Sequence, residues 1–180
     1  MHEWLVGGAV IESSVIRALG SDPGRHRDPC LLLVQNVRRG GFVDWTPPGG
    51  VIDDGEALLA GLTREVEEET GLSVTGWAGP LYEISARAPG LGWHLRVEVH
   101  RALSVAGSVR TGEDPDGIVT EAELVPEQDC ERRLADAHPW VREPLVDWMA
   151  ARWSGTRSYR YLVEGTDIAD LRITQQEPSW

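Results

Sequence analysis

Apolar and polar residues alternate most regularly over residues 93–103 of this chain. A period of two is typical of a β-strand whose two faces meet different surroundings. We predict that the apolar face packs against a core and that the polar face meets solvent, because charged side chains are rarely buried. The apolar face carries Leu95, Val97 and Val99, and the polar face carries His94, Arg96, Glu98 and His100.

Further segments have the composition of strands, at residues 4–11, 30–37, 42–46, 73–77, 81–87, 118–125, 159–163 and 171–174. The apolar run at residues 30–37 is typical of a strand that is buried on both faces. Residues 13–19 either extend the first strand or turn back as a hairpin. Glycine, proline and aspartate predict loops at residues 20–29 and 105–117.

Residues 57–70 consist mostly of good helix formers. Asp53 and Glu56 have the spacing of a capping box, and Gly71 suits the left-handed residue that follows a helix. At about 100° per residue the apolar side chains of this helix form one stripe. The stripe consists of Leu58, Leu59, Leu62 and Val66.

The C-terminal third predicts two more helices, over residues 126–133 and 139–153. We expect Pro144 to disturb one turn of the second helix, because proline lacks an N–H donor. The core face of this helix is predicted to carry Val141, Leu145, Trp148 and Met149.

Acidic residues of the helix at residues 57–70 lie beside its apolar stripe. On a helical wheel Glu69 falls inside the stripe, Glu65 and Glu68 flank it, and Glu67 faces water. Carboxylates crowded beside a buried surface repel one another and lose hydration, and a divalent cation removes both costs. Oxygen ligands of this kind suit Mg²⁺ or Mn²⁺. The alternative is a charged helix face with Arg64 and Glu68 as an ion pair.

Composition narrows the classes of function. The 180 residues are of one-domain length, and a formal net charge of −12 argues against unaided binding of nucleic acid or anionic membranes. A polyphosphate ligand would also be repelled unless metal ions reversed the local charge. The two cysteines predict neither a disulfide framework nor a zinc site. Without a signal-peptide pattern or a membrane-length apolar run, we expect a cytoplasmic location.

Residues 50–72 carry the strongest motif. Gly50 is followed after five residues by Glu56, and after seven more by Arg64-Glu65-Val66-Glu67-Glu68-Glu69-Thr70-Gly71-Leu72. This sequence resembles the Nudix box, G-x5-E-x7-R-E-U-x-E-E-x-G-U, in which U is a bulky apolar residue. Every specified position matches, and the chance of that in one register is on the order of 10⁻⁸.

The resemblance implies roles for the box residues. A divalent cation, Mg²⁺ or Mn²⁺, is expected to be held by the carbonyl of Gly50 together with carboxylates of the box helix. Arg64 is expected to pair with Glu56 and brace the unit, although Glu56 also fits a capping box alone. For Gly50, a rigid loop without a ligand role remains the alternative. The implied catalytic residues are Arg64, Glu65, Glu68 and Glu69.

The general base is not assigned by the motif. Many members of the family place an extra glutamate three residues before the glutamate of a late strand, but counting back from Glu121 reaches Ile118. This chain therefore departs from the family pattern, and Asp114 lies nearby. The candidates for base or extra ligand, in order, are Glu65, Glu113, Asp116 and Glu121.

Substrate contacts are less clearly encoded. Arg38 or Arg39 is a candidate for gripping a distal phosphate, and Trp45 and Trp93 are candidates for stacking. Buried tryptophan is the plain alternative. Pro89 resembles a proline of ADP-ribose pyrophosphatases and favours nucleoside-diphosphate sugars over nucleoside triphosphates. The polar face of residues 93–103 is expected to meet solvent, and the alternative is that Arg96 or Glu98 on this face lines the catalytic cleft.

The resemblance implies an α+β fold, an α/β/α sandwich whose mixed sheet packs against the box helix. We expect residues 1–155 to form this domain and residues 156–180 to form an extension packed on it. The implied reaction splits a nucleoside diphosphate linked to a group X into NMP and phospho-X. The alternatives are a nucleoside triphosphate pyrophosphohydrolase, a non-catalytic nucleotide sensor, and a protein-interaction module formed by the C-terminal residues 156–180. The expected partners are a small nucleotide substrate and, in a homodimer, a second copy of the chain.

Overall fold

The computed structural model describes residues 1–17, 28–111, 115–167 and 170–177. The strands are β1 (His2–Val10), β2 (Cys30–Val37), β3 (Val43–Thr46), β4 (Leu72–Ala88), β5 (Trp93–Gly107), β6 (Val119–Pro126), β7 (Arg157–Glu164) and β8 (Arg172–Gln176). The helices are α1 (Ser13–Arg17), α2 (Leu58–Thr70), α3 (Glu127–Arg133) and α4 (Pro139–Ala151), with a 3₁₀ turn at Pro89–Leu91.

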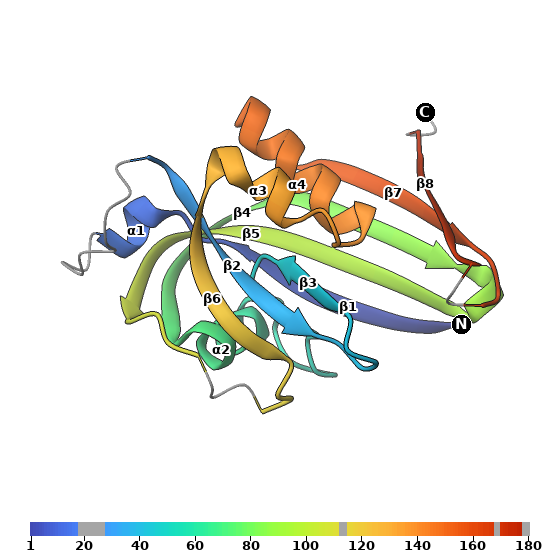
Figure 1. The fold of residues 1–180 in the computed structure, drawn as a ribbon, viewed down its shortest axis with the longest axis horizontal. Coiled ribbons are helices and arrows are strands. Elements are labelled where there is room, and N and C mark those ends of the chain that lie inside the picture. The colour runs from blue at the N-terminus through green and yellow to red at the C-terminus, as the bar shows by residue number, and fades with distance from the viewer. Residues whose placement is uncertain (18–27, 112–114, 168–169, 178–180) are drawn as a thin grey trace.

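The strands form two sheets (Figure 1). The larger has the order β1-β5-β4-β7-β8, and the smaller has the order β3-β2-β6. The larger sheet is mixed, because β1 runs parallel to β5 and β7 runs parallel to β4. The predicted α+β fold with a mixed sheet is confirmed.

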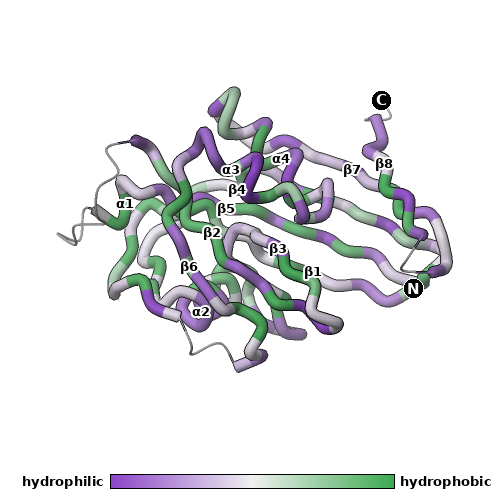
Figure 2. Tube along the Cα trace, in the orientation of Figure 1, coloured by the Kyte–Doolittle hydropathy of each residue, from purple (hydrophilic) through white to green (hydrophobic). Residues whose placement is uncertain are grey.

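Two apolar clusters hold the sheets and helices together. One lies beneath α3 and α4, and the other beneath α2. Strand β2 contributes to both, since Leu31 and Leu33 face the first cluster and Leu32 faces the second. The prediction that residues 30–37 form a strand buried on both faces is confirmed. Figure 2 shows hydrophobic residues gathered where β2 crosses β4 and β5.

Residues 13–17 form a helix, so the strand extension or hairpin predicted at residues 13–19 is wrong over this part, and residues 18 and 19 lie outside the described residues. After β1 leaves the larger sheet, Glu12 forms an isolated bridge with Leu31 of β2 in the smaller sheet. The Ser13 hydroxyl then accepts a hydrogen bond from the Cys30 N–H at 3.2 Å. The helical turn that follows buries Ile16 in the cluster beneath α2. Packing against β2 and the burial of Ile16 therefore outweighed the weak local preference of these residues for a strand.

Strand β4 replaces two predicted strands. Residues 72–88 run continuously beside β5, with shifts in pairing around Gly76 and between Ala78 and Tyr82. Pro80 has no N–H for the ladder, and a break in register is where proline is tolerated within a strand. The predicted break at residues 78–80 is therefore a local irregularity in one strand.

Two histidines on the predicted solvent face of β5 are buried. His94 is 8% exposed and His100 is 6% exposed, whereas Arg96 is exposed as predicted. His94 contacts Ser85 of β4, and His100 contacts Glu98 at 3.3 Å. These polar partners, one on the adjacent strand and one on β5 itself, allow imidazole rings to be buried on a face that the alternation predicts to be solvent-exposed.

Helix α4 covers the larger sheet mainly with Trp140, Pro144, Leu145 and Trp148. Val141 and Met149, predicted for the same face, are only partly buried. The helix continues through Pro144 and ends at Ala151, two residues before the predicted end.

The C-terminal residues extend the larger sheet. Strand β7 pairs with β4 over Tyr82–Arg87, and β8 forms a hairpin with β7. The hydroxyls of Tyr159 and Tyr161 donate to Asp147 and Glu143 of α4, at 3.1 Å and 3.0 Å. The division of the chain at residue 155 stays a prediction. Within the described residues, no helix is long and apolar enough to cross a membrane.

Candidate active site

Helix α2 begins four residues later than a capping box at Asp53 requires. Its first residue is Leu58, and Ala57 occupies the N-cap without a side-chain hydrogen bond. Glu56 does accept the Asp53 N–H, at 3.3 Å, but Gly55 has a φ of +84° between them. A helix cannot pass through that left-handed residue, so the predicted N-cap at Asp53 is wrong.

The helical wheel placed the carboxylates correctly. Leu62 and Val66 are fully buried, and Glu69 is only 8% exposed. Glu67 faces solvent. Gly71 follows the helix with a φ of +73°, as predicted. Leu59 is 40% exposed, however, and marks where the apolar stripe meets water.

The loop before α2 runs alongside β1. The carbonyls of Pro48 and Gly50 accept hydrogen bonds from the N–H groups of Ala9 and Gly7, each at 2.9 Å. Gly49 donates its own N–H to Glu69 Oε2, at 2.8 Å. The loop therefore ties the buried end of α2 to the edge strand of the larger sheet.

The two glycines of this loop make different close contacts. A Cβ on Gly49 would lie 2.2 Å from the carbonyl oxygen of Gly7, and Gly49 also has a φ of +141°. Glycine is therefore required at position 49, because a backbone atom cannot move aside and the φ is one that other residues rarely adopt. A Cβ on Gly50 would lie 2.2 Å from Glu65 Oε2, so the backbone closely approaches this carboxylate, which belongs to a flexible side chain.

Arg64 lies at the centre of an ion-pair network. Its Nη1 contacts Glu65 Oε1 at 2.6 Å and Glu68 Oε2 at 3.3 Å. Its Nη2 contacts Glu56 Oε2 at 3.0 Å, so the expected pair between Arg64 and Glu56 is present. The hydrogen bond from Arg64 lowers the pKa of Glu56, and the hydrogen bonds to Glu56 and Glu65 raise the pKa of Arg64.

Glu65 is the carboxylate of this network whose ionised form is destabilised. Burial raises its pKa above the ordinary value of 4.5, and the negative charges of Glu68 and Asp116 act in the same direction. The hydrogen bond from Arg64 opposes this shift without cancelling it. Without further positive charge, Glu65 is therefore ionised at a cost in folding free energy.

These side chains line one pocket of about 420 Å³. Helix α2 contributes Arg64, Glu65, Glu68 and Glu69, and the loop before it contributes Gly49 and Gly50. The opposite wall comes from β2, β3 and residues 115–118. The box carboxylates predicted from the sequence thus share one cavity.

The candidate bases are placed differently. Asp116 lines the pocket, whereas Glu121 is exposed on β6 and does not line it. Glu113 lies outside the described residues. Of the candidates for the general base, Glu65 and Asp116 therefore line the pocket.

Asn36 and Thr46 line this pocket but were not predicted from the sequence, whereas Arg38, which also lines it, was a predicted phosphate contact. The Asn36 amide donates to Thr46 Oγ1 at 3.0 Å, and Arg38 Nε contacts Asp44 Oδ1 at 3.2 Å. Asn36 and Asp44 are buried and directly opposite each other on β2 and β3. Two polar residues within otherwise apolar strands were the available signal. Asn36, Thr46 and Arg38 line the pocket, and Asp44 holds Arg38 in place.

The other predicted substrate contacts lie apart from this pocket. Trp45 is buried, with the guanidinium of Arg133 at 4.4 Å from its ring, so its faces are not open to a ligand. Arg39 is exposed in the turn after β2. Trp93 is partly buried between Trp4 and Trp140, with ring centroids 6.4 Å and 6.2 Å away. Its stacking role stays a prediction.

Arg96 and Glu98 line a second pocket instead of the one at α2. The alternative that they line the catalytic cleft thus gains no support from the pocket at α2. On β5 these two residues pair with Ser85 and Glu83 of β4, which line the second pocket as well.

Glu65→Gln is expected to raise the free energy of unfolding at neutral pH when divalent cations are absent. The pKa of Glu65 is higher in the folded protein than its ordinary value of 4.5, so the folded protein loses stability as the pH rises from 4.5 through the raised pKa. The gain should be absent well below pH 4.5 and present above the raised value. Urea unfolding in EDTA at both pH values measures it, with the solvent-facing Glu67→Gln as control. A less stable Glu65→Gln protein at neutral pH would contradict this.

Comparisons with known proteins show which family this chain resembles. The NUDIX domain model matches residues 15–149. A stretch of 44 residues is 50% identical to Nudix hydrolase 7 of Arabidopsis thaliana, covering 23% of this chain and 16% of that protein.

Solved structures share the fold at low sequence identity. The mutator MutT protein from Bacillus halodurans has a TM-score of 0.62 at 18% identity, covering 98% of this chain and 99% of that one. A NUDIX hydrolase from Nitrosomonas europaea has a TM-score of 0.62 at 20% identity, covering 85% and 93%. A MutT NUDIX hydrolase from Burkholderia pseudomallei has a TM-score of 0.55 at 21% identity, covering 71% and 86%. With the family model matching most of its length, the chain belongs to the NUDIX domain family.

Proposed function

We propose that this protein is a pyrophosphohydrolase that depends on a divalent cation. It adds water to the diphosphate bridge of a nucleoside diphosphate linked to another group, and it releases NMP and the phosphorylated group. The observation that carries the proposal is the shared pocket of Glu65, Glu68 and Glu69 beside the closely approaching backbone of Gly49 and Gly50. A surface helix with ordinary solvated carboxylates would not bury Glu69 in this way.

The donors of this pocket fit a hard cation. Glu65, Glu68 and Glu69 supply carboxylate oxygens of the kind that Mg²⁺ and Mn²⁺ prefer. As the side chains are placed, the described residues contain no ready group of three metal-binding side chains, and Arg64 neutralises Glu65 and Glu68. We expect these two carboxylates to exchange part of that contact for the cation. The bound cation supplies charge neutralisation of the diphosphate and acidification of water.

A backbone oxygen near the glutamates is a further ligand candidate. The Gly50 carbonyl already accepts one hydrogen bond from Gly7, and it keeps a second lone pair. Gly49 turns its N–H toward Glu69, away from β1.

The remaining pocket residues bind and position the substrate. Arg38, held by Asp44, offers a guanidinium to a phosphate on the wall opposite α2. Arg64 and Glu56 hold α2 and its preceding loop in register. Asp116 and Glu65 are the candidates for taking the proton of the attacking water.

A release assay tests this function. The protein is incubated with dinucleotides, nucleoside-diphosphate sugars and nucleoside triphosphates in Mg²⁺ or Mn²⁺, and NMP is measured by chromatography. We expect NMP from at least one diphosphate-linked substrate, complete loss in EDTA, and recovery when the cation is restored.

Other outcomes separate the alternatives. Release of pyrophosphate from triphosphates alone would favour the triphosphate pyrophosphohydrolase. Ligand binding by calorimetry without turnover in either cation would favour the nucleotide sensor. The possible homodimer and the cytoplasmic location stay predictions.

A further inference from the structure

A second pocket, of about 740 Å³, lies on the larger sheet. It is formed by β4, β5 and β7 where these strands extend beyond α2, on the face opposite the one that α4 covers. Among the described residues, none lines both this pocket and the one at α2. The proposed diphosphate chemistry therefore does not account for its side chains.

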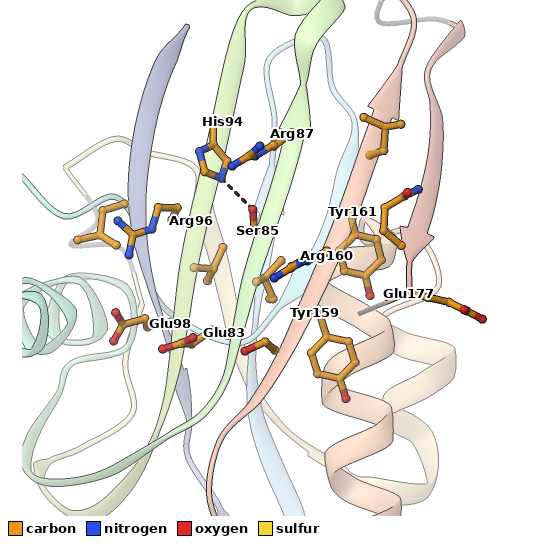
Figure 3. Close-up of a pocket in the computed structure, with 16 residues that line it drawn as sticks. Glu83, Ser85, Arg87, His94, Arg96, Glu98, Tyr159, Arg160, Tyr161 and Glu177 are labelled. Atoms are coloured by element: carbon orange, nitrogen blue, oxygen red, sulfur yellow. Dashed lines mark hydrogen bonds between the residues drawn. The ribbon is translucent and has the colours of Figure 1, made fainter. Parts of the chain in front are cut away.

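This pocket contains a serine in contact with an imidazole. Ser85 Oγ lies 2.9 Å from His94 Nε2, and His94 Nδ1 lies 3.4 Å from Glu3 Oε1 (Figure 3 draws the first contact). A nucleophile, a base and a carboxylate that orients the base are the parts of an activated serine.

The three side chains are held by strand register. Glu3 and His94 are paired directly across β1 and β5. Ser85 on β4 is paired with Arg96, so its contact with His94 is a diagonal one on the same face. Three adjacent strands therefore position the group, and none of it depends on a loop.

Burial sets the roles of the two histidine nitrogens. His94 is 8% exposed, while Ser85 is partly exposed and lines the pocket. In the tautomer that keeps its proton on Nδ1, the nitrogen nearer Glu3, the lone pair on Nε2 accepts the Ser85 proton. This is the tautomer that general-base catalysis needs.

Cationic side chains surround the serine. Arg96 and Arg160 occupy the positions directly across from Ser85 on the two neighbouring strands. Arg87 is paired with His94 one position further along, and Figure 3 shows its guanidinium beside that ring. Positive charge placed beside a nucleophile stabilises the oxyanion that forms when it attacks a carbonyl.

We propose that Ser85 and His94, positioned by Glu3, form a second catalytic site that hydrolyses small carboxylic esters. Ser85 Oγ attacks the carbonyl carbon while its proton moves to His94 Nε2. The bond from that carbon to the alcohol oxygen then breaks, and His94 gives the proton to the departing alcohol.

Water completes the cycle. It attacks the acyl group on Ser85 and gives a proton to His94 Nε2, and the proton returns to Ser85 Oγ as the acid leaves. The net reaction consumes one ester and one water and yields one carboxylic acid and one alcohol.

Labelling with a fluorophosphonate tests the nucleophile. Ser85 Oγ would bond to phosphorus as the bond to fluoride breaks, and mass spectrometry would locate the adduct on the peptide that contains Ser85. We expect labelling of the folded protein, none after heat denaturation, and none in Ser85→Ala. Ser158→Ala removes a hydroxyl from the same pocket without touching His94, and it should be labelled like the wild type.

Ester turnover tests the base and its orientation. Hydrolysis of p-nitrophenyl acetate should fall about 100-fold in Ser85→Ala. Glu3→Gln should lower kcat with little change in KM, and Glu3→Asp should recover part of the loss. A purely structural Glu3 would change the melting temperature and leave kcat unaltered.

Several results would overturn the site. These are an unlabelled Ser85 in a folded protein, equal labelling in Ser85→Ala, or equal ester turnover in both proteins. Diphosphate hydrolysis and the melting temperature of Ser85→Ala serve as the fold check. A variant that keeps both but loses labelling supports the proposal, whatever substrate the pocket at α2 takes.

Discussion

Glu69→Gln is expected to lower kcat for diphosphate hydrolysis by about 100-fold or more. Glu69 is buried beside the apolar stripe of α2, and its Oε2 accepts the Gly49 N–H at 2.8 Å. Glutamine keeps an oxygen for that hydrogen bond and removes only the negative charge that a cation requires. The measurement is NMP release at saturating substrate and metal, with metal uptake followed by calorimetry.

The control for this variant is on the same helix. Glu67→Gln removes the same charge from the solvent-facing side of α2, and it should leave kcat unchanged. Both variants should unfold at nearly the wild-type temperature. A Glu69→Gln enzyme with half the normal kcat, or equal losses in the two variants, would contradict the proposed metal site.

Gly49→Ala is expected to lower the free energy of unfolding by about 3 kcal/mol or more and to abolish turnover. The new Cβ would lie 2.2 Å from the Gly7 carbonyl oxygen, at a residue whose φ is +141°. The clash is with backbone, so relief requires the loop to move away from β1. That movement would also break the hydrogen bond between Gly49 and Glu69.

Gly55→Ala separates backbone strain from the clash. Gly55 also has a positive φ, of +84°, but no atom lies within 4 Å of an added Cβ. We expect a loss of only about 1 kcal/mol there, from the left-handed backbone alone. Urea unfolding measures both variants. Equal losses would show that close approach to β1 is not what requires glycine at position 49.

These expectations share a physical origin. In the proposed metal site the carboxylates of α2 would hold a cation, and the raised pKa of Glu65 indicates that its charge lowers stability when the cation is absent. Removing the charge of Glu65 should therefore raise stability and lower activity at the same time. Arg64 moderates the cost by contacting Glu65 and Glu68.

Patterns within one segment of the chain were sufficient for the box helix and its carboxylates. The order of apolar and acidic residues placed Glu69 inward and Glu67 outward, and the structure has them so. The run at residues 30–37 was likewise a doubly buried strand. Helix and strand periods depend on neighbouring residues, so they can be read from the order of residues alone.

Contacts between distant segments determined the rest. Residues 13–17 became helical because β2 lies against them, and Trp45 became core because α3 supplies Arg133. His94 is buried because Glu3 and Ser85, on strands far apart in the chain, pair beside it. Such contacts arise from strand order and register, which involve residues tens of positions apart and leave no periodic trace in the sequence.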